Sequence, residues 1–370
     1  MRLFDPKQLL TFAVDDPQLV KALNKETRAY LAATEDHRYA DKGMWLKAGV
    51  LLLACQGFYL AALFLQSGIG FFVCYLAMMM CAMLLVINVV HDASHNAFLR
   101  GEKANAWLNR VIAIPLGMDP DCWRVRHVLF HHHYTNIDSY DPDTAENGLL
   151  RQMPQQRWRA FMRWQRFYWP VVAALTFPWY IWVMDWLDRG GFTPVTRHLA
   201  QQGISGWCCF LSGKLAHLVF CVFIPVWLLA GHLSLMAILG IYFLCQMISS
   251  MVFVTLIIGT HWAKGHNPQP SNDGKLATGK LAHAFATTCD WSVHPQWLGY
   301  WLGGFNLHLT HHLFPHWNHR HYPELSRIIA QIARQQGLDY QQLSWSELRA
   351  LQQGFLQRMG EQAEDQPVEN

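Results

Sequence analysis

Three clusters of histidine are the residues of this chain whose types and spacing could do chemistry. They are HDASH at residues 91–95, HVLFHHH at 127–133 and HLTHH at 308–312. Histidines four residues apart share one face of a helix, so His91 and His95 can bind one metal ion, and the same spacing recurs in the second cluster. A neighbouring histidine lies about 100° further round the helix and can reach a second ion. The clusters therefore predict a metal site, although imidazole nitrogen suits iron, copper and zinc alike.

The number of clusters gives this interpretation its weight. Twenty histidines in 370 residues give about one HxxxH pair by chance, so a single cluster would mean little. Each of the three follows a long apolar run or lies in the polar middle of the chain, where a group of neutral imidazoles serves no packing purpose. Two other histidines, His217 and His232, lie within an apolar run or at its turn, and we expect them to serve polar packing.

The composition indicates a membrane protein. Hydrophobic residues make up 52% of the chain and charged residues 15%, whereas a soluble domain carries about 25% charged residues. The net charge of +3 gives no reason to expect nucleic-acid binding. The nine cysteines are scattered and include no CxxC pair, which argues against a disulfide framework or a zinc–thiolate site.

Two long stretches contain no Asp, Glu, Lys or Arg. They cover residues 48–91 and 215–263, and each is interrupted near its middle by glycine and polar residues. Because about 20 apolar residues span a bilayer as a helix, each stretch is long enough for two spanning helices joined by a turn. The predicted spans are about 45–66, 69–90, 214–231 and 234–259.

A third apolar stretch, about 167–186, is expected to lie in the membrane interface. It contains Pro170, Pro178 and several tryptophans, which suit a helix at the bilayer surface. The second and third histidine clusters can also share a site only if an even number of helices crosses the membrane between them. Lys and Arg lie outside the two hairpins, so the positive-inside rule places both termini in the cytosol.

The expected organisation has three parts. Residues 1–44 form a cytosolic segment without a signal peptide, residues 45–340 form the membrane domain, and residues 341–370 form a cytosolic tail. The tail is expected to be disordered after Gly360 because its composition is polar and charged.

Three stretches carry a resemblance to a known family. HDASHNAF, WRVRHVLFHHHYTNIDSYDPD and GGFNLHLTHHLFP, the last followed by HYPEL, resemble the membrane fatty-acid desaturases, and most closely the bacterial acyl-CoA desaturases of the linoleoyl-CoA type. The likeness runs from about residue 44 to residue 340, and the Leu-Phe-Pro after the third cluster is its most specific part. It implies an all-α integral membrane protein with four transmembrane helices in two hairpins and a cytosolic helical cap that holds a di-iron site.

The resemblance also implies a ligand set for two iron ions. It adds His261, in IIGTHW, to the three clusters, and His308 stands where many relatives have Gln. The third consecutive histidine of the second cluster, His133, could replace a neighbour. The implied ligands are His91, His95, His127, His131, His132, His261, His308, His311 and His312. The residues expected to orient them are Asp92, Asp138, Asp141 and Asn306, with Asp143 as a further acidic neighbour.

The activity implied is the O₂-dependent desaturation of a long-chain fatty acyl-CoA or acyl-lipid, with no catalytic residue beyond the ligands. One alternative is a hydroxylase or ketolase of the same iron class, acting on an alkane, sphingoid base or carotenoid. A second alternative, from a different class of protein, is a metal transporter or sensor. The sequence has no His-Pro-Gly-Gly or GxGxxG signature. An external electron donor is therefore expected: a ferredoxin, flavodoxin or cytochrome with its reductase. The expected location is the bacterial inner membrane. The position of the double bond, the acyl carrier, the donor and the oligomeric state stay open.

Overall fold

The computed structural model describes residue 6 and residues 9–361. The chain forms two compact units. Unit 1 comprises the described residues of Met1–Tyr39, Arg126–Trp169 and Leu256–Asn370, and unit 2 comprises Ala40–Val125 and Pro170–Thr255. Most of the described residues are helical, as the sequence predicts.

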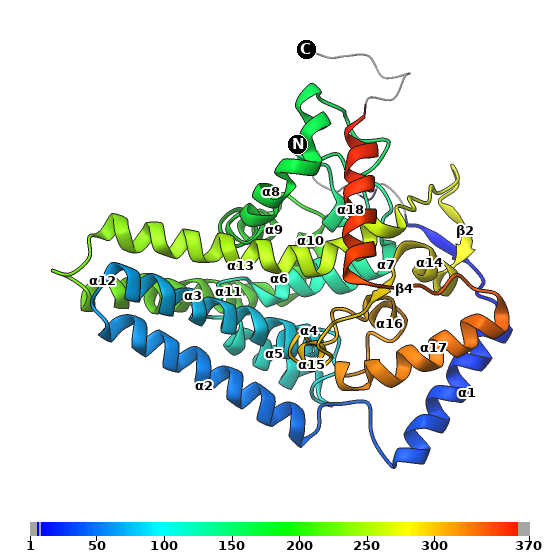
Figure 1. Cartoon of the computed structure of the whole chain (residues 1–370), viewed down its shortest axis with the longest axis horizontal. Coiled ribbons are helices and arrows are strands. Elements are labelled where there is room, and N and C mark those ends of the chain that lie inside the picture. The colour runs from blue at the N-terminus through cyan, green and yellow to red at the C-terminus, as the bar shows by residue number, and fades with distance from the viewer. Residues whose placement is uncertain (1–5, 7–8, 362–370) are drawn as a thin grey trace. The chain divides into compact units, whose positions relative to one another are not determined.

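Unit 2 begins with a helical hairpin. Helix α2 (Lys42–Phe64) starts where the side chain of Asp41 accepts a hydrogen bond from Met44 N, and α3 (Gly68–Leu85) starts at Ser67 in the same way. The two helices pack along each other (Figure 1). Helix α3 continues through a π-helical turn, η1 (Val86–Val90), into α4 (His91–Ser94). The short helices α5 (Glu102–Ile112) and α6 (Pro120–Arg124) follow.

The second half of unit 2 is a series of helical segments that pack on this hairpin. The hydroxyls of Tyr59 and Tyr75 donate hydrogen bonds to the backbone carbonyls of Phe220 and Cys221, at 2.6 and 2.9 Å. These carbonyls belong to a π-helical turn, and the tyrosines anchor it to the hairpin. The segments are η5 (Tyr180–Met184), α9 (Asp185–Gly190), α10 (Val195–Leu199), η6 (Ala200–Gln202), α11 (Gly203–Leu218), η7 (Val219–Phe223) and α12 (Ile224–Leu228).

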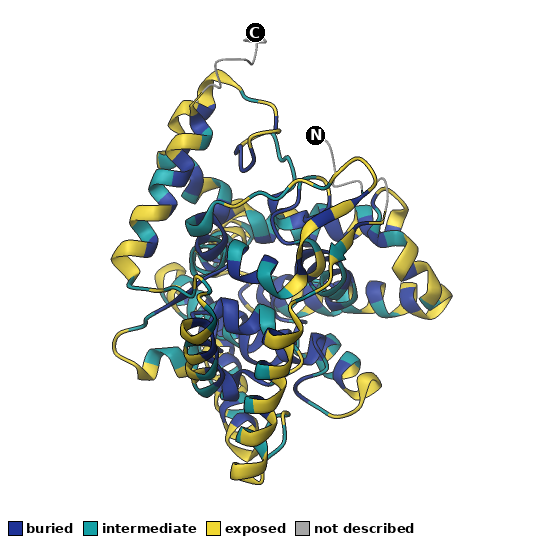
Figure 2. Cartoon of the chain, turned by 90° about the vertical axis from the view of Figure 1, so that its right-hand side faces the viewer, coloured by how far each residue is buried: buried dark blue, intermediate teal, exposed yellow. Residues whose placement is uncertain are grey.

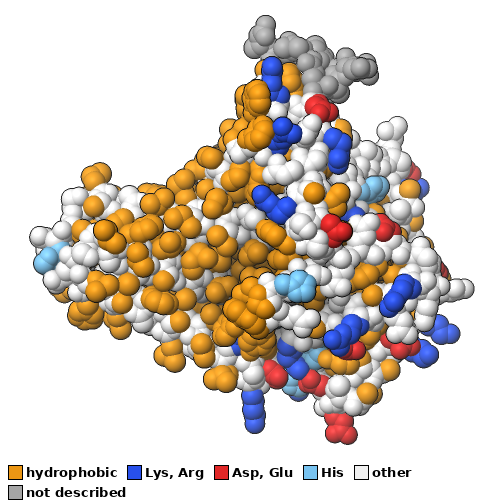
Figure 3. Space-filling model, in the orientation of Figure 1, with side chains coloured by type: hydrophobic (Ala, Val, Ile, Leu, Met, Phe, Trp, Pro, Cys, Tyr) orange, Lys and Arg blue, Asp and Glu red, His pale blue; other side chains and the backbone are white. Residues whose placement is uncertain are grey.

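The surface of the hairpin is apolar. Figure 3 shows hydrophobic side chains gathered over α2 and α3, and Leu53, Phe64 and Ile69 are 74%, 78% and 82% exposed. Contiguous apolar surface of this kind marks contact with a membrane or another protein. In the described part of the chain, five helices are long and apolar enough to cross a bilayer: Lys42–Phe64, Gly68–Ser94, Ala160–Gly190, Val195–Leu228 and Leu235–Lys264.

These helices differ in two ways from the predicted spans. The helix over Val195–Leu228 starts well before residue 214, where the third span was predicted to begin. Lys214 lies inside this helix and does not interrupt it. The Lys214 ammonium is buried and donates to the carbonyls of Gly117 and Ile181 and to Asp185, each at 2.8 Å. The helix over Ala160–Gly190 adds a fifth candidate to the four predicted, and its interfacial placement stays a prediction.

Unit 1 is built round helix α17 (Tyr322–Gln336), which packs against α1 (Pro17–Thr34). Leu19, Leu23 and Ile329 belong to the hydrophobic core they share, which also includes residues of α14 (Lys280–Thr287) and α16 (His308–Leu313). Two small parallel strand pairs complete this part. They are β1 (Thr11–Ala13) with β2 (Lys275–Gly279), and β3 (Asp290–Trp291) with β4 (Gln342–Leu343).

The C-terminal helix α18 (Trp345–Gly360) also packs into unit 1. It starts with a capping box between Ser344 and Glu347, and its buried side carries Leu348 and Phe355 (Figure 2). The predicted disorder after Gly360 concerns mainly residues 362–370, which lie outside the described residues. The remaining elements are η2 (Val125–His131), α7 (His132–Tyr134), η3 (Pro142–Thr144), η4 (Ala160–Trp164), α8 (Gln165–Trp179), α13 (Leu235–Lys264), α15 (Trp297–Trp301) and η8 (His319–His321).

Candidate metal centre

The second histidine cluster lies on a π-helix rather than an α-helix. The turn η2 covers Val125–His131, and a π-helix places residues five apart on one face. His127 and His132 therefore meet, with their Nε2 atoms 3.2 Å apart. The rings of His127 and His131, which an α-helix would place together, stack with centroids 5.5 Å apart. The helix face that the α-helical period predicts for His127 and His131 therefore also carries His132.

The third cluster joins the second within unit 1. Nε2 of His311 lies 2.8 Å from Nε2 of His132, and Nε2 of His308 lies 3.0 Å from Nε2 of His261. Ligand atoms that lie within 4.8 Å of one another belong to His131, His261, His308 and His312. Unit 1 thus brings together seven of the nine histidines in the implied ligand set.

The nitrogen spacing fits metal coordination. Imidazole nitrogens bound at about 2.0–2.1 Å and separated by 90–110° at the metal lie about 2.8–3.4 Å apart, a range that includes the 2.8–3.2 Å seen here. Nε2 of His312 is buried and accepts or donates no hydrogen bond among the described residues. Burial and the neighbouring histidines hold the pKa of His312 well below its usual value, so its ring is neutral and free to bind a cation.

A carboxylate orients one of the clustered histidines. Nδ1 of His131 lies 3.0 Å from Oδ1 of Asp141 and 3.4 Å from Oδ2 of Asp143. Asp141 is fully buried and also accepts from the backbone N–H groups of Asn136 and Asp143. Burial lowers the pKa of His131, but the two carboxylates outweigh it and raise the pKa to about 9. With a metal on Nε2, His131 would keep its Nδ1 proton and donate it in a hydrogen bond to Asp141, which fixes the tautomer of the ligand.

We expect Asp141→Asn to weaken metal binding by about 10- to 100-fold, because it removes the charged acceptor of the His131 N–H. Asp138→Asn is the matched control, since the Asp138 side chain accepts from Ser139 and contacts none of the clustered histidines. Titration of the metal-free protein with metal, followed by fluorescence or calorimetry, measures both. Equal affinities for the two variants would contradict the role given to Asp141.

Two further contacts fix the orientation of ligand histidines. The Tyr322 hydroxyl lies 2.9 Å from Nδ1 of His311, and Nδ1 of His261 donates to the carbonyl of Thr287 at 3.2 Å. Sequence reasoning missed both groups. Tyr322 is the tyrosine of the HYPEL motif, so its place next to the third cluster in the sequence was the available signal.

A buried carboxylate holds the start of α16. Asp290 accepts from the backbone N–H groups of Leu309 and Thr310, at 2.8 and 3.2 Å, and from the hydroxyls of Thr310 and Tyr340, at 2.8 and 3.1 Å. Burial raises the pKa of Asp290 to about 6, although these donors act in the opposite direction. Asp290 therefore anchors the helix that carries His308, and sequence reasoning missed it as well.

The first histidine cluster belongs to unit 2. His91 and His95 are buried, and their ring centroids are 5.3 Å apart. Nδ1 of His91 lies 3.6 Å from Oδ1 of Asp92, one of the residues expected to orient a ligand. The π-helical turn η1 ends immediately before His91.

Other candidate residues lie apart from the clustered rings. His133 is exposed and donates from Nδ1 to the carbonyl of Val128. Asn306 donates to the carbonyl of Trp291. His217 is buried in unit 2, where its ring nitrogens meet Ile114 O and the Tyr242 hydroxyl, whereas His232 is exposed.

Comparison with known proteins decides the family. The model of the fatty acid desaturase family matches residues 66–344, which is most of the chain. The chain belongs to the fatty acid desaturase family. An sn-1 linoleoyl-lipid 6-desaturase of Synechocystis is 28% identical over 86% of this chain and 89% of its own length. A second, from Arthrospira platensis, is 25% identical over 86% of each chain. An acyl-lipid (8-3)-desaturase of Physcomitrium patens is 26% identical over 79% of this chain and 59% of its own.

The desaturase is therefore a membrane enzyme that introduces a double bond into a long-chain fatty acyl substrate. Its histidine clusters fit the two-metal site expected of such a centre. The rival readings as a metal transporter or sensor are not supported, because the family match covers the stretches that carry all three clusters.

Proposed function

We propose that this desaturase uses two iron ions, bound by nine histidines, to desaturate the acyl chain of a membrane lipid with O₂. The observation that carries the proposal is the group of seven largely buried histidines in unit 1, in which three pairs of Nε2 atoms lie 2.8–3.2 Å apart. His91 and His95 complete the set on the strength of their spacing and the resemblance of HDASH to the desaturase pattern.

Iron supplies the chemistry that removes hydrogen from an unactivated CH₂ group with O₂ as oxidant. The protein holds and orients the ligands: Asp141 faces the far nitrogen of His131, Tyr322 that of His311, and the Thr287 carbonyl that of His261. The Asp141 and Thr287 contacts each fix a ring tautomer so that the other nitrogen is available to a metal, and the Tyr322 contact orients the ring of His311. Because the sequence has neither a flavin nor a cytochrome b5 signature, the electrons come from a separate carrier protein.

The acyl carrier proposed is a membrane lipid rather than coenzyme A. Two of the relatives are named linoleoyl-lipid 6-desaturases and a third an acyl-lipid desaturase, and the first two match most of this chain. An acyl chain has few polar groups, so binding rests on burial of its CH₂ groups at about 0.8 kcal/mol each. The position of the double bond is then set by how far the acyl chain extends into its binding site.

The topology proposed has four membrane crossings with both termini in the cytosol of a bacterium. His131 and His308 belong to one cluster of unit 1, so the chain between them crosses an even number of times. Three candidate helices lie between these residues, over Ala160–Gly190, Val195–Leu228 and Leu235–Lys264. The first has the lowest mean hydropathy of the three, 1.3, and is the one assigned to the interface.

Expression in a host with a simple lipid profile, followed by gas chromatography of fatty acids from each lipid class, tests the function. We expect a new olefin on lipid-bound C16 to C18 chains, absent with the matched inactive variant His261→Ala. Trace alcohol is compatible with this result because desaturation and hydroxylation share the first hydrogen abstraction. A hydroxylated main product, or a product formed only on acyl-CoA, would contradict the assignment.

A further inference from the structure

A stretch of unit 1 alternates arginine with aromatic residues. Residues 147–184 contain no Asp or Glu, and the sequence RWRAFMRWQRFYW at 157–169 places four arginines among six aromatic residues. Ala160, the first residue of the candidate membrane helix Ala160–Gly190, lies inside this stretch. The stretch therefore lies at the water-facing end of a helix that enters or lines the membrane.

Some members of the stretch have structural roles and are not available. Arg151, upstream, is buried and donates to the carbonyls of Pro154, Met359 and Glu361. Gln165 is buried and donates to the carbonyls of Arg151 and Leu356. These bonds fix η4 and the start of α8 against α18 and leave their outer side facing away from the unit.

The outer side carries a patch that we call the arginine–aromatic patch. Phe161, Trp164 and Phe167 are 43%, 60% and 60% exposed. Arg157, Arg159 and Arg163 are exposed as well, and Figure 3 shows Lys or Arg and hydrophobic side chains side by side around η4, α8 and α18. The patch consists of Arg157, Arg159, Phe161, Arg163, Trp164 and Phe167.

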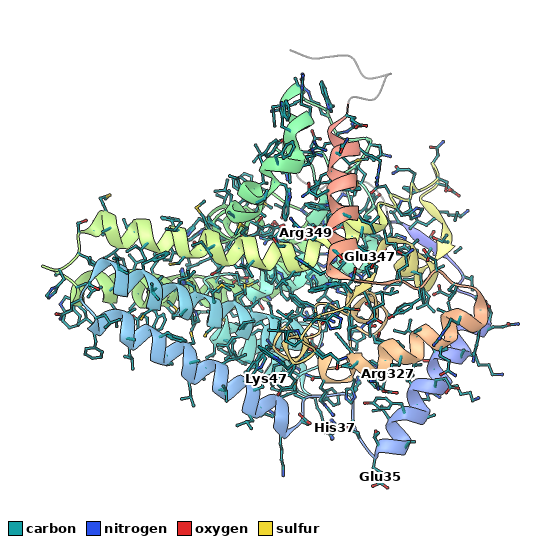
Figure 4. All side chains as sticks on the ribbon, viewed as in Figure 1. Glu35, His37, Lys47, Arg327, Glu347 and Arg349 are labelled. Atoms are coloured by element: carbon teal, nitrogen blue, oxygen red, sulfur yellow. The ribbon has the colours of Figure 1, made fainter. Side chains whose placement is uncertain are left out.

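Within the described part of the chain, two arginines of the patch have no carboxylate partner. Among the described residues, neither Arg159 nor Arg163 forms an ion pair, and Nε of Arg163 donates to the Ala160 carbonyl. Arg166 donates to Gln357 and lies over the ring of Phe167. The neighbouring helix α18 brings one acid, Glu347, and two further arginines, Arg349 and Arg358; Glu347 and Arg349 are labelled in Figure 4. The described residues around the patch therefore carry a net positive charge.

We propose that the arginine–aromatic patch binds the phosphate groups of anionic phospholipids in the bilayer. Arginine pairs with phosphate through two parallel N–H bonds, and tryptophan prefers the level of the lipid head groups. Continuity with a candidate membrane helix places both residue types at that level. An acidic electron carrier would suit the arginines, but it gives no reason for three exposed large aromatic rings among them.

A lipid-retention experiment on the full-length protein tests the proposal. The protein is incubated in micelles with equal amounts of phosphatidylglycerol and phosphatidylcholine and passed over a gel-filtration column, and the retained lipids are measured by mass spectrometry. We expect preferential retention of phosphatidylglycerol, weakened by salt. Each arginine contributes about five-fold, so the triple variant R157Q/R159Q/R163Q should lose at least about ten-fold of the preference.

The matched control changes three exposed arginines on α1 and α17, in the variant R28Q/R327Q/R334Q; Arg327, labelled on α17 in Figure 4, has a side chain that is 77% exposed. This control should keep the preference of the parent protein. If the triple variant does not give a monodisperse peak, Arg159→Gln alone should lose about five-fold. Unchanged retention in the patch variants would overturn the proposal. Unchanged retention with slower turnover on a protein electron donor would assign the patch to that donor instead.

Discussion

Replacing His312 with alanine is expected to remove metal and to lower desaturation by more than about 100-fold. The reason is that its Nε2 is a buried nitrogen without a hydrogen-bond partner among the described residues, and its ring offers a ligand atom within 4.8 Å of those of three other histidines. Loss of a group that merely orients a ligand costs about 10- to 100-fold, so loss of the ligand itself costs more. Plasma emission spectrometry of the purified protein, with an assay of turnover, measures both effects.

His232→Ala is the control for this experiment because His232 is an exposed histidine at the turn between α12 and α13. It should keep the metal content and the activity of the parent protein. Two iron ions per chain in the parent and fewer in His312→Ala would support the iron assignment. Full activity in His312→Ala, or zinc in place of iron in an active parent protein, would contradict it.

Asp290→Ala is expected to lower the free energy of unfolding by about 3 kcal/mol or more and to reduce metal binding. The substitution leaves the buried N–H groups of Leu309 and Thr310 and the Tyr340 hydroxyl without their acceptor, and each such group costs about 1–3 kcal/mol. It also frees the start of α16, which carries three of the clustered histidines. Thermal unfolding in detergent, with and without added metal, measures the loss.

Two variants separate this role from a general effect of removing a carboxylate. Asp290→Asn keeps one oxygen for the two backbone N–H groups and should show an intermediate loss. Asp339→Ala removes an exposed carboxylate paired with Lys264 at 2.8 Å, and should change stability by less than about 1 kcal/mol. A loss in Asp290→Ala no larger than that in Asp339→Ala would contradict the anchoring role.

Two of the candidate membrane helices could be predicted from the absence of charged residues along the sequence. The predicted spans at 45–66 and 69–90 correspond to α2 and to the helix over Gly68–Ser94 within a few residues. The start of the helix over Val195–Leu228 could not be predicted, because Lys214 reads as the end of an apolar run. Only the fold supplies Asp185, 29 residues away in sequence, as the partner that allows this lysine to be buried.

The histidine clusters could be found from their spacing, but their pairing could not. An α-helical period pairs His127 with His131, whereas the π-helical turn brings His132 to His127. His261 is a lone histidine on a long apolar helix, so only the resemblance to the family singled it out. Asp290 and Tyr322 act through contacts that form only when distant segments meet, and local patterns do not reveal them.

The π-helical turn in the second cluster bears on how such a site can arise. A π-turn contains one residue more than an α-turn and returns to α geometry beyond it, as η2 does at α7. The insertion of a single codon into an ancestral α-helix would therefore be enough to bring a new histidine onto the ligand face. Because the extra residue is absorbed within one turn, the segments downstream keep their places. A metal-binding face could thus gain a ligand in one genetic step, without the rest of the helix having to be rebuilt.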